Sequence, residues 1–196
     1  MNSFSDLPHG NRIERRYGSK ILIQPFIDRD EVNYYQSDLK LSPTLTVGGS
    51  SYSGHSFDIG TTASCKLSDQ PPKMVVLTIL HEVTDPLMWH FPSPRQSDSI
   101  HQRNQSAALQ ILADGTEINP LKGRQMGLRK DLPSDDTYYD AIFIEMPFSA
   151  FSIIAHAFIV EITIHDASFF LDDTSRAALK SFADIMIEGV DPESLR

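Results

Sequence analysis

The last quarter of the chain, Tyr138 to Met186, constrains the fold more than any other stretch. Within it, the run from Phe158 to Ile164 has an apolar residue at every even position, and these positions share one face of an extended strand. Every residue of the run except Glu161 is β-branched or aromatic, a composition typical of a packed sheet. We therefore expect a strand with its even face, Phe158 included, turned toward the core.

Three further elements surround this strand. Residues 141–146 predict another strand, which Pro147 ends, and residues 149–157 have the apolar content of a short helix. The polar turn at residues 165–167 then reverses the chain into residues 168–171. This order of elements predicts a hairpin in which the two strands lie antiparallel.

A closing amphipathic helix is expected after Asp172 or Asp173, whose carboxylates can accept hydrogen bonds from the first free amides of a helix. Apolar residues then recur at helical spacing, and Gly189 is a natural stop. The residues of this apolar stripe are Ala178, Leu179, Phe182, Ile185 and Met186.

In outline, this succession of elements resembles the end of some uncharacterised bacterial β-rich domains. The residues that carry the resemblance are 151–157, Val160-Glu161-Ile162, Phe170-Leu171 and Ala178-Leu179. The resemblance implies this architecture and no activity.

Earlier segments predict more strands. Residues 73–81 form the most continuous apolar run, which is typical of a strand at the centre of a sheet. Residues 20–27 predict a strand whose end lies at an edge or bulge because of Pro25. Residues 106–113 predict another, closed by a hairpin turn at Asp114-Gly115, and residues 44–47 and 51–59 alternate on either side of a turn at Gly48-Gly49.

The expected fold is mostly β, or α+β when its helices are counted. We predict an antiparallel β-sandwich-like domain of about eight to ten strands, with a short helix near 149–157 and a C-terminal amphipathic helix. Residues 1–19 are polar and predict a flexible leader, and residues 28–38 predict a loop or a short helix. Residues 20–188 then form one β-rich domain, and residues 189–196 a tail.

Composition excludes several classes of protein. The net charge is −9. From Asp131 onward the sequence contains 13 acidic residues and only three basic ones, Arg176, Lys180 and Arg196, and this excess of negative charge opposes general nucleic-acid binding. Cys65 is the only cysteine, so no intrachain disulfide can form. No apolar run is long enough for a membrane span, and the start has no signal-peptide pattern, so a cytoplasmic location is expected.

No residue is predicted to be catalytic, to bind a cofactor or to bind a metal. His81-Glu82 lacks the second histidine of the zinc-protease helix, and no Gly-x-Ser-x-Gly occurs. The glycine-rich segment 48–55 lacks the Lys-Ser/Thr of a phosphate loop. Metal ligands would have to converge in space, for example from His55, His81, His90 and His101.

The remaining distinctive residues have both a functional and a packing interpretation. Trp89 either plugs the end of a sheet or stands in a groove as a stacking platform. Cys65 is either a small buried filler or a thiol activated by Lys66, and His156 is expected to cap its short helix. The cations of 122–130 form either a contact loop or a solvated hairpin tip. The residues selected as a candidate binding surface are Trp89, His90, Lys122, Arg124, Arg129 and Lys130.

The leading hypothesis is a non-catalytic binding or accessory protein that engages another protein or a second copy of itself, without a cofactor. It is motivated by a strong fold signal beside the absence of a convergent catalytic set. A carbohydrate-binding module is the first alternative, with stacking candidates Trp89, Tyr34, Tyr35 and Tyr52. A hydrolase with a spatially assembled site around His81, Asp85 and His90 is the second alternative.

Overall fold

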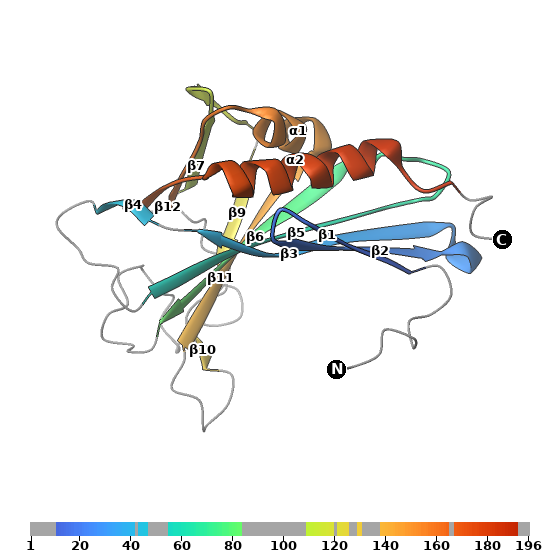
Figure 1. The fold of residues 1–196 in the computed structure, drawn as a ribbon, viewed down its shortest axis with the longest axis horizontal. Coiled ribbons are helices and arrows are strands. Elements are labelled where there is room, and N and C mark those ends of the chain that lie inside the picture. Colours follow the sequence, from blue (N-terminus) through green and yellow to red (C-terminus); the bar gives the residue numbers. More distant parts are fainter. Residues whose placement is uncertain are drawn as a thin grey trace.

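The computed structural model describes residues 11–41, 43–46, 55–83, 109–119, 121–125, 129–130, 138–164 and 167–191. It is mostly antiparallel β with two sheets and two helices, which confirms the predicted fold class. Figure 1 shows both helices and strands of the smaller sheet on the same side of the larger sheet.

The large sheet has the order β1-β2-β3-β5-β6-β11-β10, and β9 also pairs with β11. Every pairing in it is antiparallel, and β6 lies between β5 and β11, as its continuous apolar run predicts. The strands are β1 (Arg12–Arg16), β2 (Ser19–Phe26), β3 (Glu31–Leu41), β5 (His55–Cys65), β6 (Met74–Val83), β9 (Lys122–Gln125), β10 (Arg129–Lys130) and β11 (Tyr138–Pro147).

The small sheet has the order β4-β13-β12-β7-β8 and contains the predicted hairpin of the last quarter. The Phe57 ring of the large sheet lies 4.8 Å from the Phe169 ring of the small sheet, so the two sheets share one core. The strands are β4 (Pro43–Thr46), β7 (Leu109–Ala113), β8 (Thr116–Glu117), β12 (Val160–Ile164) and β13 (Ala167–Phe170).

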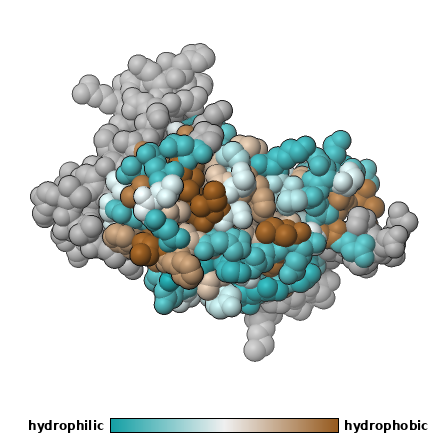
Figure 2. Space-filling view, turned by 90° about the horizontal axis from the view of Figure 1, so that it is seen from above, coloured by the Kyte–Doolittle hydropathy of each residue, from teal (hydrophilic) through white to brown (hydrophobic). Residues whose placement is uncertain are grey.

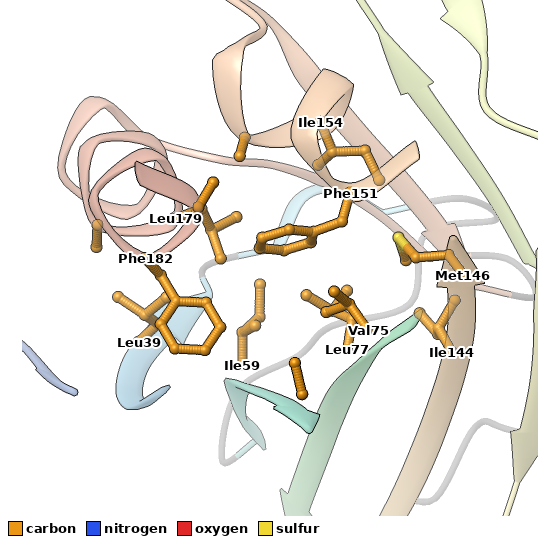
Figure 3. Close-up of a cluster of buried hydrophobic side chains, with 14 of the residues drawn as sticks. Leu39, Ile59, Val75, Leu77, Ile144, Met146, Phe151, Ile154, Leu179 and Phe182 are labelled. Carbon is orange, nitrogen blue, oxygen red and sulfur yellow. The ribbon is translucent and has the colours of Figure 1, made fainter. Parts of the chain in front are cut away.

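Two helices cover the inner face of the large sheet, α1 (Phe148–His156) and α2 (Asp173–Glu188). The whole predicted stripe of α2 is buried, and Figure 3 shows Leu179 and Phe182 of α2 facing Leu39 and Phe151. Burial of such side chains contributes roughly 1.5–3 kcal/mol each. Packing of the helices on the large sheet therefore stabilises the fold.

Both ends of α2 are built as the sequence predicts. The Asp172 carboxylate accepts a hydrogen bond of 2.7 Å from the Ser175 amide, which makes Asp172 the N-cap. Gly189 ends the helix with a φ of 71°, a conformation that glycine adopts without strain. A Cβ at this position would also lie 2.7 Å from Gln70 Oε1, so any other residue would have to displace the Gln70 side chain.

The predicted leader is wrong over its last part. Arg12–Arg16 form β1, which pairs with β2 through a two-residue turn at Tyr17-Gly18, both with positive φ. This is the backbone of a tight hairpin turn. Arg16 also donates a 3.2 Å hydrogen bond to Ser181 Oγ, which links β1 to α2. Residues 1–10 lie outside the described residues.

Two other expectations for the first third need correction. Residues 28–38 are not a loop or a short helix throughout, because after a 3₁₀ turn at Ile27–Arg29 they form most of β3. The described parts of the two alternating runs around Gly48-Gly49 belong to β4 and β5, which lie in different sheets. β4 pairs with β13 in the small sheet, whereas β5 pairs with β3 and β6 in the large one.

The strand of the last quarter begins later than its pattern predicts. Val160, Ile162 and Ile164 are buried, but Phe158 precedes β12 and is 80% exposed. Asp114 Oδ1 accepts a hydrogen bond from the Phe158 amide at 3.0 Å, so this residue belongs to a turn and not to the ladder. The prediction that Phe158 faces the core is therefore wrong.

Candidate functional site

Apolar side chains are exposed where α1 ends and β12 begins. We call Ile153, Phe158 and Ile159 the apolar corner; they are 56%, 80% and 59% exposed. Figure 2, which views the helix-covered side, shows brown apolar residues among a mainly hydrophilic surface. An aromatic ring that stands in water on an ordered backbone would gain free energy if a partner buried it.

The backbone of the apolar corner is fixed by the β7–β8 hairpin. Asp114 Oδ1 accepts hydrogen bonds from the Phe158 and Ile159 amides at 3.0 and 2.8 Å. The Asp114 amide in turn donates to the Ile159 carbonyl at 2.8 Å. Asp114-Gly115 was predicted only as a hairpin turn, which its positive φ values confirm. Its second role, holding the corner rigid, has no signal in the sequence.

His156 anchors the other side of the corner. Its Nδ1 lies 2.8 Å from the Ser152 carbonyl, one turn earlier in α1, so the predicted capping role is confirmed. Its Nε2 lies 3.2 Å from Asp184 Oδ1 of α2, and Lys180 donates to Asp184 Oδ2 at 2.8 Å. Burial alone would raise the pKa of Asp184, but these hydrogen bonds together with the charge interactions of the same two partners outweigh it, so the pKa is lowered. This network ties α1 to α2 at the surface.

The outer face of the large sheet, opposite the helices, has an open groove of about 310 Å³. Alternation explains its composition, because Val75 and Leu77 of β6 face the core while Met74 and Val76 face outward. We call this the outer groove. It is lined by Asn33, Tyr35, Thr62, Ala63, Ser64, Met74 and Val76.

The structure brings four of the predicted surface residues to one strand. Lys122 and Arg124 lie opposite Glu145 and Phe143 of β11, and Arg129 and Lys130 pair with Tyr139 and Tyr138 of the same strand. Arg124 lies over the Phe143 ring, with 5.5 Å from its Cζ to the ring centroid. For the other three cations only the backbone is described, and Trp89 and His90 lie outside the described residues.

The histidine of the hydrolase hypothesis lies in the core. His81 is 1% exposed and stacks on the Phe57 ring, with centroids 4.3 Å apart and an interplanar angle of 5°. Its partner across the ladder is Asp140, which is equally buried. Asp85 and His90, the other members of that hypothetical site, lie outside the described residues.

Cys65 is half-buried and packs against the core at the end of β5. Burial, followed by the nearby negative charge of Asp69, raises the pKa of its thiol to about 11. The thiolate is the reactive form of cysteine, so the raised pKa opposes the activation by Lys66 that the sequence left open. The position is that of a packing residue.

This shift predicts slow thiol chemistry. The rate of alkylation of native protein by iodoacetamide is expected to rise with pH to a midpoint near 11, because the folded protein holds the thiol protonated up to that pH. Unfolded protein in urea should give a midpoint near the ordinary cysteine value of about 8.5. Equal midpoints for the folded and unfolded chains would contradict the raised pKa.

Comparison with known proteins adds no assignment: no family model, no curated protein and no solved structure matches this chain. Within the described residues, no three or more His, Cys, Asp or Glu side chains are placed to hold a metal ion. Neither helix in the described part of the chain has the length and hydropathy needed to cross a membrane.

Proposed function

We propose that this chain is a non-catalytic binding protein that engages another protein through the apolar corner. The observation that carries the proposal is Phe158, an aromatic side chain 80% exposed on a backbone held by Asp114. Aromatic residues on rigid supports dominate the energetics of protein interfaces, because little conformational entropy is lost when they bind.

The surroundings of Phe158 fit an interface better than a catalytic centre. Ile153 of α1 and Ile159, the next residue in the chain, are also exposed apolar side chains, while Asp114 and Glu117 of the hairpin that holds the Phe158 amide are exposed and acidic. An apolar centre with a polar rim is the usual composition of an interface. A partner with an apolar pocket and basic residues around it would be complementary to this surface.

The proposal is tested by photocrosslinking at the corner. The chain is made with p-benzoylphenylalanine in place of Phe158 and irradiated in an extract of the cells from which the protein comes. A single discrete adduct is expected, because a rigid interface holds one partner against the probe. An adduct of twice the chain mass would identify a second copy as that partner.

The matched control carries the same probe at Tyr17, which is 59% exposed in the β1–β2 turn and has no part in the corner. It should give no discrete adduct. A chain that carries both the probe at position 158 and the substitution Asp114→Ala should give a lower yield of the adduct, because the Phe158 and Ile159 amides lose their hydrogen-bond acceptor. Identical adduct patterns from the two probe positions, or no adduct from either, would overturn the proposal.

A further inference from the structure

The outer groove combines an exposed aromatic ring with uncharged polar groups. Tyr35 and Met74 are 37% and 49% exposed, and Asn33, Thr62 and Ser64 contribute an amide and two hydroxyl groups. Pairing across the sheet sets these side chains in two neighbouring rows, with Tyr35 opposite Thr62 and Asn33 opposite Ser64. The strands of an antiparallel sheet hold such rows about 5 Å apart, so the lining is a fixed platform.

The polar groups of the outer groove are available to a ligand. In the part of the chain that the structure describes, the side chains of Asn33, Thr62 and Ser64 have no hydrogen bond to other protein groups. Amide and hydroxyl groups both donate and accept hydrogen bonds. They therefore match a ligand whose own polar groups are hydroxyls.

We propose that the outer groove is a binding site for a neutral saccharide, with the face of one sugar ring stacked on Tyr35. No lining side chain carries a charge at neutral pH, so the groove offers no oppositely charged partner for a phosphate, a carboxylate or an amine. Its volume of about 310 Å³ lies at the small end of the range of ligand sites, about 300–1,000 Å³.

This site is independent of the proposed protein contact, because the groove lies on the outer face of the large sheet and the apolar corner on the helix-covered side. It also revises the predicted set of stacking residues. Tyr34 is fully buried and takes no part in the site, whereas its neighbour Tyr35 points the other way and lines the groove. Trp89 and Tyr52 lie outside the described residues.

The test is a glycan array followed by titration of the strongest neutral hit, monitored by amide chemical shifts of labelled protein. Binding to one or more neutral oligosaccharides is expected, with shift changes concentrated in β3, β5 and β6. Tyr35→Ala should weaken binding roughly tenfold because the stacking face is lost. Tyr35→Phe keeps the ring and should bind within about threefold of the natural chain.

Tyr17→Asn is the matched control, since it removes another exposed tyrosine from a turn whose positive φ asparagine tolerates. It should bind as the natural chain does. Absence of any neutral glycan hit, binding restricted to charged glycans, or shift changes away from the three strands would each overturn the site. The shift map uses the unaltered protein, so it decides the question even when a Tyr35 variant folds poorly.

Discussion

Replacing Phe182 with alanine is expected to lower the free energy of unfolding by about 3–5 kcal/mol, the cost of a cavity in a closely packed core. The Phe182 ring is fully buried beneath α2 and meets the Phe151 ring edge-on, with centroids 6.2 Å apart. Figure 3 shows it between Leu39 and Leu179, so neighbouring side chains leave little room to collapse into the space. Urea unfolding followed by circular dichroism measures the change.

Phe158→Ala is the control for that measurement. It removes an identical side chain that is 80% exposed, and its effect on stability should stay within about 0.5 kcal/mol. Large losses for both variants would contradict the exposure of Phe158, and small losses for both would contradict the burial of Phe182.

Gln70→Ala is expected to cost about 2–4 kcal/mol, because one side chain makes four hydrogen bonds. Its Oε1 accepts from the Tyr34 hydroxyl and from the Val190 amide, both at 2.7 Å. Its Nε2 donates to the carbonyls of Leu67 and Val190 at 2.8 and 3.0 Å. Burial raises the pKa of Tyr34, so the phenol stays protonated and would be left as a buried donor without an acceptor.

Two further variants test the four hydrogen bonds of the Gln70 side chain. Gln70→Glu keeps the acceptor but cannot donate when ionised, so at neutral pH it should also be destabilised and should recover part of the loss in acid, where the carboxyl regains a proton. Glu188→Ala, at an exposed position near the same end of α2, should change stability by less than about 0.5 kcal/mol. Equal stability of the natural chain and the Gln70→Ala variant would show that the Gln70 hydrogen bonds do not hold the end of α2.

The elements that could be predicted are those with a clear local pattern. β12 and α2 repeat their apolar residues at the spacing of a strand and of a helix, and α2 carries its own cap at Asp172 and stop at Gly189. Asp114-Gly115 is likewise a local turn signal. For such segments, burial of one face and local backbone preference favour the same structure.

The elements that could not be predicted depend on distant partners. In β3 the inward position after Tyr34 is Gln36, which breaks the apolar alternation. It is tolerated because its Nε2 donates to Ser19 Oγ and to the Ala178 carbonyl, the latter 142 residues away. The β1–β2 turn was missed because tyrosine seldom adopts the positive φ found at Tyr17.

The candidate sites were predicted least well, for the same reason. The pattern of β12 places Phe158 in the core, and only its hydrogen bond to Asp114, 44 residues earlier, reverses that prediction. Tyr34 and Tyr35 were interchangeable in the sequence, and the register of β3 decides which of them is exposed. Of the predicted binding surface, only Arg124 has a described side-chain contact.

Hydroxyl-radical footprinting with mass spectrometry tests most directly whether both helices seal one face of the large sheet and leave the two sites exposed on opposite sides. Phe158 and Tyr35 are expected to be oxidised rapidly in the native protein, while the buried Phe182 and Tyr34 are protected until the chain is unfolded. Oxidation of Phe182 or Tyr34 at the rate of its exposed counterpart, or protection of both Phe158 and Tyr35, would contradict this arrangement.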